Sequence, residues 1–570
     1  MEKILKFHLN KTIAIIVSLI LLGFLLYFNS FHNSLFWDDY DGILNNAYIK
    51  NFQYWPKFFT ENLIAGAGFL SDYWRPMVLM VFSFGWHLWQ DNPVGYHFIN
   101  ILFHIANSLL LFFILRKLFK KENIAFLVAL IFLIHPLQTE AITYVSGVAD
   151  PLSTLFIFLV IISFIKLIET KIKIFGIVMV IFYIFSLMSK ETAIMTPAIL
   201  FLIGWFYFDN LLSKEKIKKI IVYLLPLILI AFIYVGLRLT ILNFQNTLNL
   251  YTEENFFTQR FDLRLLTFFK TIPLYFNFMF FPIDLQMERQ LLIPKSIFEP
   301  LVIGGIIIII LLGILIIKNF KNYYAVSFGG LWFFILLLPV SNIFIPISGL
   351  IYEHWLYLPL IGIFSIIFLT ADYLISKYKL KKIGLVVLIV FLIFLSFRTI
   401  LRNSEWSNPV SFYQQIIKHN PNSYRVWNNL GIEAEKRYNF DLAKRAYEKA
   451  ILIQEDNPIA YHNLGVLLFK EGDLEKAKWY FKKAIEEDKE FFYSYLFLAK
   501  IYWSNHQLDK AIEVLQNYLK VTERADIYFV LSQLYKEENN KEESIKNLFQ
   551  ALRLDPQNTL YHQEMELLQR

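Results

Sequence analysis

Long apolar runs, separated by short polar segments, fill the first 400 residues of this chain. A helix that crosses a bilayer needs about 20 apolar residues. The pattern predicts eleven such helices, at 12–29, 96–115, 123–135, 151–168, 173–188, 192–208, 217–238, 299–317, 324–342, 355–374 and 382–400. A further apolar stretch at 265–283 contains Lys270, Pro273 and Pro282. We expect this stretch to be re-entrant or to lie in the membrane surface.

Basic residues give the predicted helices a direction. Lys and Arg concentrate in cytoplasmic loops of membrane proteins. With the N-terminus inside, five Lys- or Arg-rich loops become cytoplasmic: "RKLFKKE" (116–122), "KLIETKIK" (166–173), "SKEKIKK" (213–219), "KNFKN" (318–322) and "SKYKLKK" (376–382). The first apolar run lacks a small-residue cleavage site, so it is predicted to be an anchor. The C-terminus is then expected outside.

The region after residue 402 has a different pattern, charged and amphipathic with a period of 34. Residues recur at that spacing: Leu430 and Leu464; Gly431 and Gly465; Ala443, Ala477 and Ala511; Tyr447, Phe481 and Leu515. This period is typical of the paired helices of tetratricopeptide repeats. About four repeats are predicted, with a half-repeat before them and a capping helix at 558–570.

Such a solenoid has an extended concave surface that commonly binds a peptide or protein. Asn429 and Asn463 occupy equivalent positions on the first helices of two repeats. They are candidate groove residues that would bond a peptide backbone. A solvated helix face or hydrogen bonds between repeats are the alternatives.

The sequence therefore predicts an all-α protein: a polytopic membrane domain at 1–402, with a long outer loop at 30–95, and a tetratricopeptide solenoid at 403–570. The chain is 56% hydrophobic, with a mean hydropathy of +0.47, which excludes an ordinary soluble enzyme. It has no Cys, so disulfides, thiolate metal sites and cysteine nucleophiles are excluded. The net charge of +7 is explained by basic cytoplasmic loops, and no nucleic-acid partner is predicted.

Polar residues gather on the face opposite the basic loops. Ionisable groups at a membrane are costly and are functional candidates by default. The candidates are Asp38, Asp39, Arg75, His135, Glu140, Tyr144, Lys190, Glu191, Tyr352, Glu353 and His354. A site built from them would face the exterior.

Several of these residues have a structural and a chemical interpretation. Asp38 and Asp39 could cap a helix, or act as a general base that takes a proton from an attacking hydroxyl. Arg75 could clamp a phosphate bidentately or anchor the chain at the interface. Lys190 beside the free amides of a helix start would favour an anion. His135, before Pro136, could simply close a helix.

Glu140 and Tyr144 are one helical turn apart and share a face. Asp150 before Pro151 fits a helix cap. One reaction would use the whole set: sugar transfer from a polyprenyl phosphate needs a base for the acceptor hydroxyl and cations for the departing phosphate. A divalent ion, Mg or Mn, bound at the two aspartates is an open alternative, although a calcium loop ending at Gly42 would need an acid where Trp37 stands.

The order of these blocks is similar to a known family. The segments are "WDDYDGILNN", "WRPM", "GYHFINILFHIANSLLLF", "HPLQTEAITYVSGVADPLS", "SKETA" and "YEHWLYLP", followed by the repeats. Together they resemble the transmembrane-and-tetratricopeptide-repeat O-mannosyltransferase family of the GT-C glycosyltransferase superfamily. The bias toward Ile, Lys, Asn and Phe favours a bacterial member.

The resemblance implies a GT-C fold, a lipid-phosphate sugar donor and an outer-face active site. It implies that Asp38 or Asp39 matches the first-loop acid, and that Lys190 and Glu191 match a Lys-Glu pair. The chain departs from the family where Val148 and His354 replace cations. A histidine replaces a cation only when it is protonated.

The predicted function is transfer of a sugar, such as mannose, from a polyprenyl-phosphate carrier to a hydroxyl of a protein that the repeats present. Asp38 or Asp39 would be the base, Arg75 and Lys190 would hold phosphate, and the other candidates would shape the site. The predicted location is a bacterial inner membrane, with the repeats periplasmic or extracellular. The alternatives are a non-catalytic scaffold that recruits envelope proteins and a transporter of the lipid carrier.

Overall fold

The computed structural model describes residues 2–207, 213–242, 244, 256–319, 324–347, 349–556 and 558–569. These residues form helices and turns without a β-strand, which confirms the predicted all-α class. The chain divides into two compact units, Met1–Asn408 and Pro409–Arg570, called unit 1 and unit 2 below. The predicted loop at 239–262 and the loop at 318–322 lie partly outside the described residues.

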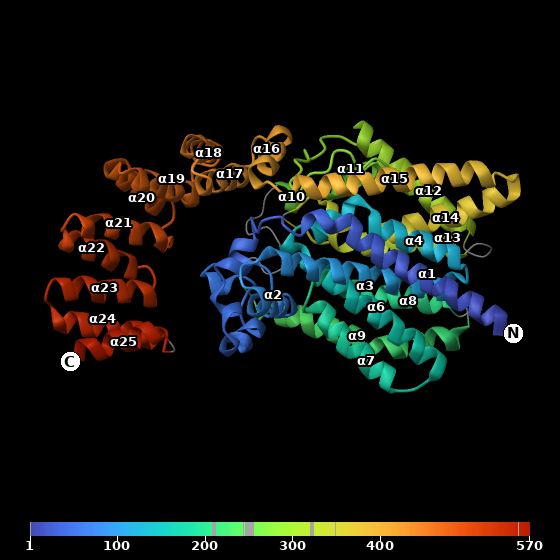
Figure 1. Ribbon diagram of the computed structural model, residues 1–570, viewed down its shortest axis with the longest axis horizontal. Helices are drawn as coiled ribbons and strands as arrows, with labels where there is room; N and C mark the ends of the chain where they lie inside the picture. The colour runs from blue at the N-terminus through green and yellow to red at the C-terminus, as the bar shows by residue number, and fades with distance from the viewer. Residues whose placement is uncertain are drawn as a thin grey trace. The chain divides into compact units, whose positions relative to one another are not determined.

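Unit 1 is a bundle of apolar helices (Figure 1). Seven helices in the described ranges are long and apolar enough to cross a membrane: α1 (Glu2–Tyr27), α3 (Pro93–Phe119), α6 (Ala149–Thr170), α9 (Lys214–Leu239), α12 (Pro300–Asn319), α14 (Pro359–Tyr378) and α15 (Lys381–Glu405). The number becomes eight if α4 (Glu122–Ile134) and the segment after it, bent by 52°, form one span. The protein is therefore a multi-pass membrane protein.

The predicted count of eleven spans is not confirmed. Helices lie at three further predicted positions, but they are short: α7 (Ile174–Leu187), α8 (Thr196–Tyr207) and α13 (Tyr324–Leu337). The stretch predicted to be re-entrant forms most of α11 (Phe261–Phe280), which is not among the helices with spanning length and composition. A Cβ at Gly305 would lie 1.8 Å from the Phe269 carbonyl oxygen, so α11 and α12 pack backbone against backbone.

The first outer loop is not a simple coil. It contains α2 (Pro76–Trp89) and several short helical turns, including a π-turn at Tyr40–Leu44 that follows the aspartates. Two more short helices matter for the site: α5 (Thr139–Ile142) and the 3-10 helix η7 (Val145–Val148). α10 (Phe256–Gln259) completes the unit.

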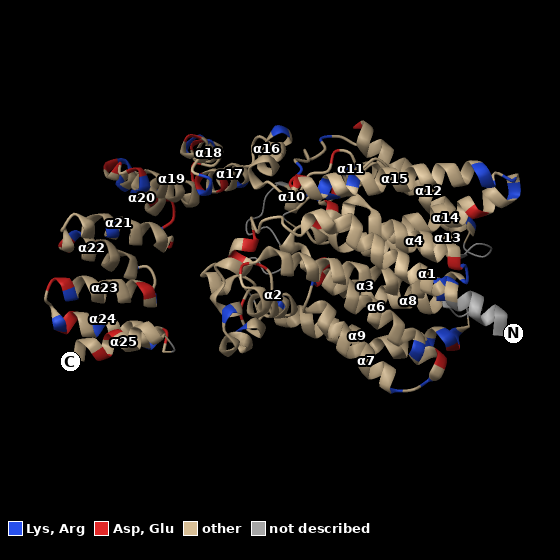
Figure 2. Ribbon diagram, in the orientation of Figure 1, with Lys and Arg blue, Asp and Glu red and all other residues tan. Residues whose placement is uncertain are grey.

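Charge separates the two ends of this bundle. α6 and α14 each end in a Lys-containing turn, at Lys171 and Lys377, whereas α15 begins at Lys381. Figure 2 shows Lys and Arg gathered at that end of the helices. The opposite ends, where α6 and α14 begin and α15 finishes, carry most of the predicted site residues. This asymmetry is the one that cytoplasmic loops of membrane proteins show.

Unit 2 is a stack of paired helices (Figure 1). α16 (Pro409–His419) comes first. Four pairs follow: α17 (Tyr424–Lys436) with α18 (Phe440–Ile453), α19 (Pro458–Glu471) with α20 (Leu474–Glu487), α21 (Phe492–Ser504) with α22 (Leu508–Leu519), and α23 (Ala525–Glu537) with α24 (Lys541–Leu554). α25 (Thr559–Gln569) is last. Polar side chains cap several of these helices, as where Asn457 accepts the Ile459 amide.

The period of 34 has a packing cause. A Cβ at Gly465 would lie 2.8 Å from the Phe481 ring, so only glycine lets this ring cross the first helix of the repeat. Gly431 and Tyr447 repeat the arrangement one period earlier. Ala477 and Ala511 are fully buried where the helices of a pair meet.

The division between the units falls after Asn408, within the segment 402–409 where the charged, amphipathic pattern begins. α15 continues to Glu405, and its last residues are buried in unit 1: Arg402 is 2% exposed, and Asn403 and Trp406 are fully buried. The polar segment that resembles a linker is thus the end of a packed helix.

Candidate functional site

The segment 135–150 connects the polar clusters of unit 1. It leaves α4 at His135, forms α5 and η7, and enters α6 at Ala149. A Cβ at Gly147 would lie 2.6 Å from the carbonyl oxygen of Glu140, so the chain folds back on itself and only glycine permits the approach. Side chains from this one compact segment therefore reach three polar clusters.

The first-loop cluster contains Asp38, Asp39, Tyr144 and Ser146. Asp39 is 1% exposed, and its Oδ1 accepts the Ser146 amide at 2.8 Å and the Ser146 hydroxyl at 2.5 Å. Its Oδ2 accepts the Phe36 amide at 3.1 Å. Burial raises the pKa of Asp39 to about 7, although these hydrogen bonds lower it. Asp39 thus fastens the first loop to η7.

Asp38 is the exposed member of the cluster. Its amide donates to the Tyr144 hydroxyl at 3.1 Å, and Tyr144 stacks on Trp406 with ring centroids 5.5 Å apart. Trp406 also lies 6.0 Å from the Phe36 ring. The backbone of Asp38 is therefore fixed by buried aromatic residues, and its side chain also bonds the Tyr144 hydroxyl. Asp38 is exposed whereas Asp39 is buried, so Asp38 is the more accessible proton acceptor of the two.

The ion-pair cluster contains Arg75, Asp150, Lys190 and Glu191. Arg75 grips Glu191 bidentately, through Nε at 3.2 Å and Nη2 at 2.7 Å. Lys190 donates to Asp150 Oδ1 at 2.6 Å, and its side chain is 9% exposed. The predicted phosphate ligands thus already have carboxylate partners. An ammonium has three donors, so Lys190 keeps capacity for a further acceptor.

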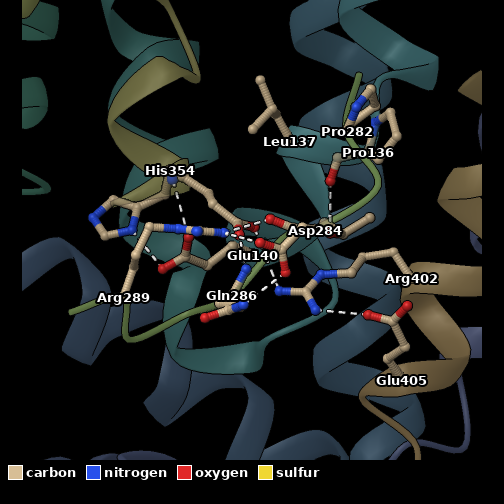
Figure 3. Close-up of polar contacts among 12 residues, drawn as sticks. Pro136, Leu137, Glu140, Pro282, Asp284, Gln286, Arg289, His354, Arg402 and Glu405 are labelled. Carbon is tan, nitrogen blue, oxygen red and sulfur yellow. Dashed lines mark hydrogen bonds and ion pairs between the residues drawn. The ribbon is translucent and has the colours of Figure 1, made fainter. Parts of the chain in front are cut away.

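The third cluster, called the Glu140–Glu353 network, joins α5, the turn before α14 and the end of α15 (Figure 3). Glu140 accepts both the His354 amide at 3.0 Å and His354 Nδ1 at 2.7 Å. Glu353 is 1% exposed, accepts the Gln286 amide and lies 3.4 Å from Arg402 Nη2. Burial raises the pKa of Glu353 to about 7, against the lowering effect of Arg402.

Further charges complete this network. Arg402 Nη1 donates to Glu405 at 2.7 Å, and Arg398 Nη1 donates to the other oxygen of Glu405 at 2.7 Å. Arg289 donates to the Asp284 carboxylate at 3.1 Å, and Figure 3 shows it beside Glu140 and His354. The buried carboxylate of Glu353 thus has an arginine partner from another segment, and α15 holds that arginine in place through Glu405.

The three clusters lie at the same end of the helices. Ser146, which binds Asp39, and Asp150, which binds Lys190, are four residues apart along η7 and the first turn of α6. A rise of 1.5–2.0 Å per residue separates them by about 6–8 Å. Glu140 adjoins both through the close approach at Gly147. Asp39 and Lys190, the partners of Ser146 and Asp150, therefore both lie beside the N-terminal end of α6.

An apolar groove begins beside the ion-pair cluster. It has a volume of about 640 Å³ and lies between α8, α9 and α13. Its lining runs from Ile194, in the same 3-10 helix as Glu191, to Trp205 near the other end of α8. The eleven steps from Ile194 to Trp205 rise about 16 Å, half the thickness of a bilayer core. Phe232, which lines the groove, is 73% exposed, so the groove opens toward lipid.

Two predicted site residues, His135 and Tyr352, are not members of the three polar clusters. His135 is fully buried: Nδ1 accepts the Leu137 amide at 3.2 Å, and Nε2 bonds the Met279 carbonyl at 2.9 Å. It joins the end of α4 to α11. Tyr352 lies at the rim of the Glu140–Glu353 network, where its ring stacks on His354 at 5.4 Å.

Sequence reasoning missed the arginines of the network. Arg402 lies at the predicted boundary between the two domains, and Arg289 lies in a segment without a motif. One signal was present: a cation every four residues near the end of the last apolar run, at Arg398 and Arg402, places two guanidinium groups on one helix face.

The described residues do not form a good site for a divalent ion. Such ions take several oxygen ligands, and no group of three or more His, Asp or Glu side chains in the described ranges could hold one. Both oxygens of Asp39 are committed to protein hydrogen bonds.

In unit 2, Asn463 Nδ2 donates to Asn428 Oδ1 of the preceding repeat at 2.9 Å. Asn463 thus makes the inter-repeat hydrogen bond that was one of its interpretations. Asn429 is half-buried on α17.

Known proteins resemble both units. A family profile described as dolichyl-phosphate-mannose-protein mannosyltransferase matches residues 75–237, and tetratricopeptide repeat profiles match residues 424–457, 446–478, 468–524 and 525–558. Protein O-mannosyl-transferase TMTC3 of Mus musculus is 25% identical over 80% of this chain and 52% of its own length. The Homo sapiens protein of the same name is 22% identical over 94% of this chain and 67% of its own. A solved structure titled "Crystal structure of MamA" is 21% identical, covers 26% of this chain and 86% of its own, and has a TM-score of 0.24.

The fold and these polar clusters define a class: a multi-pass membrane protein with a buried charged site at one end of its helices and a tetratricopeptide solenoid. The matches agree with the resemblance to the transmembrane-and-tetratricopeptide-repeat O-mannosyltransferase family, of the GT-C superfamily, that the sequence blocks carry. The chain spans about half to two thirds of the length of the curated relatives it matches.

Proposed function

We propose that this protein transfers a sugar, such as mannose, from a polyprenyl-phosphate carrier to a protein hydroxyl on the extracytoplasmic face of a bacterial inner membrane. One observation carries the proposal: an apolar groove that opens to lipid starts at the helix that holds Glu191, beside two cations. A lipid phosphate matches this arrangement, because it joins a long apolar tail to an anionic head. The tail would lie in the groove and the head at Lys190 and Arg75.

The reaction is a single displacement. The acceptor hydroxyl oxygen attacks the anomeric carbon, and the bond from that carbon to the phosphate oxygen breaks. The phosphate keeps the electron pair, and Asp38 takes the hydroxyl proton. Asp39 does not touch the substrate; it positions Asp38 by fastening the loop to Ser146. Displacement from one side inverts the configuration at the anomeric carbon.

The cations act on the leaving group. Lys190 and Arg75 would lower the energy of the negative charge that develops on the phosphate, and the groove would exclude water around it. Asp150 and Glu191 hold these cations in place before substrate arrives. The site therefore pays little reorganisation energy when phosphate binds.

The solenoid would present the acceptor protein. Lys- and Arg-rich loops lie at the end of the bundle opposite the polar clusters, which fits an outer-face site by the positive-inside rule. The N-terminus is then cytoplasmic and unit 2 is periplasmic or extracellular.

The test incubates membranes containing the full chain with a polyprenyl-phosphate-linked labelled sugar and follows label in protein. Asp38→Asn should reduce transfer about 10²–10⁴-fold, the usual range for a lost general base. Asp39→Asn should reduce it less, because its carbonyl oxygen still accepts the Ser146 amide. Asp91→Asn, an exposed residue of the same outer loop, is the matched control and should transfer normally. Wild-type transfer by Asp38→Asn would refute the assignment.

A second function is favoured by one observation: Arg75 and Lys190 already have carboxylate partners. A non-catalytic membrane scaffold, whose repeats recruit envelope proteins, needs no open phosphate site. It predicts that partner capture survives Asp38→Asn combined with Asp39→Asn but is lost with Phe481→Ala, and that no label enters protein.

A further inference from the structure

A buried polar face runs along α3, which packs against α1, α4 and α6 (Figure 1). Four of its polar side chains are at most 1% exposed: His97, Asn100, His104 and Asn107. Their spacing of three or four residues places them on one side of the helix. Polar groups inside a membrane domain are costly unless they are bonded, so four of them on one face are functional candidates.

Asn100 bonds the segment that carries the first-loop cluster. Its Nδ2 lies 3.2 Å from each of three carbonyl oxygens, those of Ile142, Tyr144 and Val145. These carbonyls surround the point where α5 ends and η7 begins. The Tyr144 hydroxyl accepts the Asp38 amide, and Ser146 binds Asp39. Asn100 therefore fixes the segment to which both aspartates are attached.

Asn107, two turns further along α3, bonds the start of α6. Its Nδ2 donates to the Pro151 carbonyl oxygen at 2.8 Å. The residue before this proline, Asp150, accepts a hydrogen bond from Lys190 at 2.6 Å. Asn107 therefore fixes the position of the carboxylate that holds the lysine of the ion-pair cluster.

The two histidines of this face bond the remaining site segments. His104 Nε2 donates to the Leu133 carbonyl at the end of α4 at 3.1 Å, and Nδ1 of the neutral ring accepts the Tyr357 hydroxyl at 2.9 Å. Tyr357 directly follows the turn that carries Glu353 and His354. His97 Nε2 donates to the carbonyl of residue 33, shortly before the aspartates, at 2.9 Å. One helix face thus contacts the segments that carry all three polar clusters.

We propose that α3 positions the two halves of the transfer site: Asn100 positions the proton acceptor, and Asn107 positions the phosphate-binding lysine. The proposal rests on the proposed function, because these groups are those of its reaction. Neither asparagine touches the substrate, since each acts through carbonyl oxygens of the segment 142–151. The two asparagines should therefore affect different kinetic constants.

The first experiment replaces each amide by an apolar side chain of similar size and measures transfer by the full chain in nanodiscs. Asn100→Leu should lower kcat about 10²-fold, because a misplaced base is costly, and leave the KM for the lipid donor unchanged. Asn107→Leu should raise that KM about tenfold, the effect of one weakened hydrogen bond to phosphate, and lower kcat less. Asn100→Gln and Asn107→Gln keep the amide on a longer side chain and should change the same constants by less.

Ser108→Ala is the matched control. Ser108 is fully buried on the same helix, and its hydroxyl donates at 2.7 Å to the Ala129 carbonyl in the middle of α4, outside the segment 135–150. The variant loses a buried hydrogen bond to a carbonyl and should keep both wild-type constants. A purely structural role of α3 predicts less folded protein for every variant and unchanged constants for the fraction that folds. That outcome, or equal changes of kcat and KM in both asparagine variants, would overturn the proposal.

Hydrogen exchange separates this inference from the proposed function, because it reports local opening without any transfer. In Asn100→Leu, exchange should speed up at the Asp38 and Ser146 amides but not in the segment 189–193. In Asn107→Leu, it should speed up in 189–193 but not at those two amides. This crossed pattern in a protein without transfer would refute the proposed function and still support positioning by α3. Equal exchange changes in both variants would overturn the inference whether or not label is transferred.

Discussion

Polar contacts in the two units join residues that are very different distances apart in the sequence. In unit 1, Arg75 and Glu191 are 116 residues apart, and Glu140 and His354 are 214 apart. In unit 2, Asn428 and Asn463 are 35 apart. The solenoid is therefore built from neighbouring repeats, whereas the candidate site exists only when the ends of distant helices meet.

The difference also concerns burial. Glu353 and Arg402 face each other at 1% and 2% exposure, and without Arg402 the Glu353 carboxylate would be buried without a cation partner. Lys470 in unit 2 pairs with Glu435 but is 57% exposed, so water can replace its partner. Charge should thus govern the stability of unit 1, and apolar packing that of unit 2.

The largest loss of stability is expected when a buried packing residue of unit 2 is removed. Phe481→Ala removes a fully buried ring and should cost about 4 kcal/mol. Because repeats contact mainly their neighbours, hydrogen exchange should speed up in α19, α20 and α21 but not in α3 of unit 1. Trp479→Ala, a 52% exposed neighbour, is the control. Exchange that rises equally in both units would contradict this locality.

A buried charge in unit 1 should come next. Arg402→Ala leaves Glu353 buried without its cation and should destabilise unit 1 by about 3 kcal/mol. Thermal unfolding in one detergent compares it with Lys470→Ala, which should change stability by at most about 0.5 kcal/mol. Equal losses for the two variants would show that burial does not distinguish the units.

Acid should weaken unit 2 through His462. This side chain is buried against Ser494 and several rings, and burial lowers its pKa to about 4. The folded state then binds fewer protons than the unfolded state, so stability is complete above about pH 6.5 and falls toward pH 4. Hydrogen exchange of α19 in the full chain should show a loss of about 2 kcal/mol between pH 7 and pH 5.

The matched variant is His462→Gln, which should lose this acid dependence whatever its stability at pH 7. Persistence of the full acid effect in the variant would assign it to other groups. His354 of unit 1 differs from His462, because its side chain is 24% exposed whereas His462 is buried.

The smallest effect is expected at Asn463. Asn463→Ala removes one hydrogen bond between repeats and should cost about 1 kcal/mol. Thermal unfolding gives this value, and labelling of the acceptor protein is measured alongside. Unchanged stability with lost labelling would instead make Asn463 a groove residue, as the sequence alone allowed.

The solenoid could be predicted because its rules are local. Gly465 and Phe481 meet within one repeat, so a fixed spacing carries the contact. Hydropathy likewise predicted α6 and α15, but not that α7, α8 and α13 are only 14, 12 and 14 residues long. Their ends depend on turns such as Ser189–Lys190, which hydropathy does not resolve.

The site was less predictable because its partners are remote. Asp150 fits a helix cap, yet it binds Lys190, 40 residues away. Arg402 stands in a segment with the composition of a linker, and it faces Glu353 from 49 residues away. The candidate residues could be named from their cost at a membrane, but the pairing among them depends on helix packing.

The central claim is that one lipid phosphate binds where the ion-pair cluster meets the apolar groove. The most direct test is an electron cryomicroscopy structure of the full chain with polyprenyl phosphate bound. We predict phosphate density within hydrogen-bonding distance of Lys190 or Arg75, and tail density between α8, α9 and α13. Phosphate density at the Lys-rich turn between α14 and α15, with an empty groove, would contradict the account.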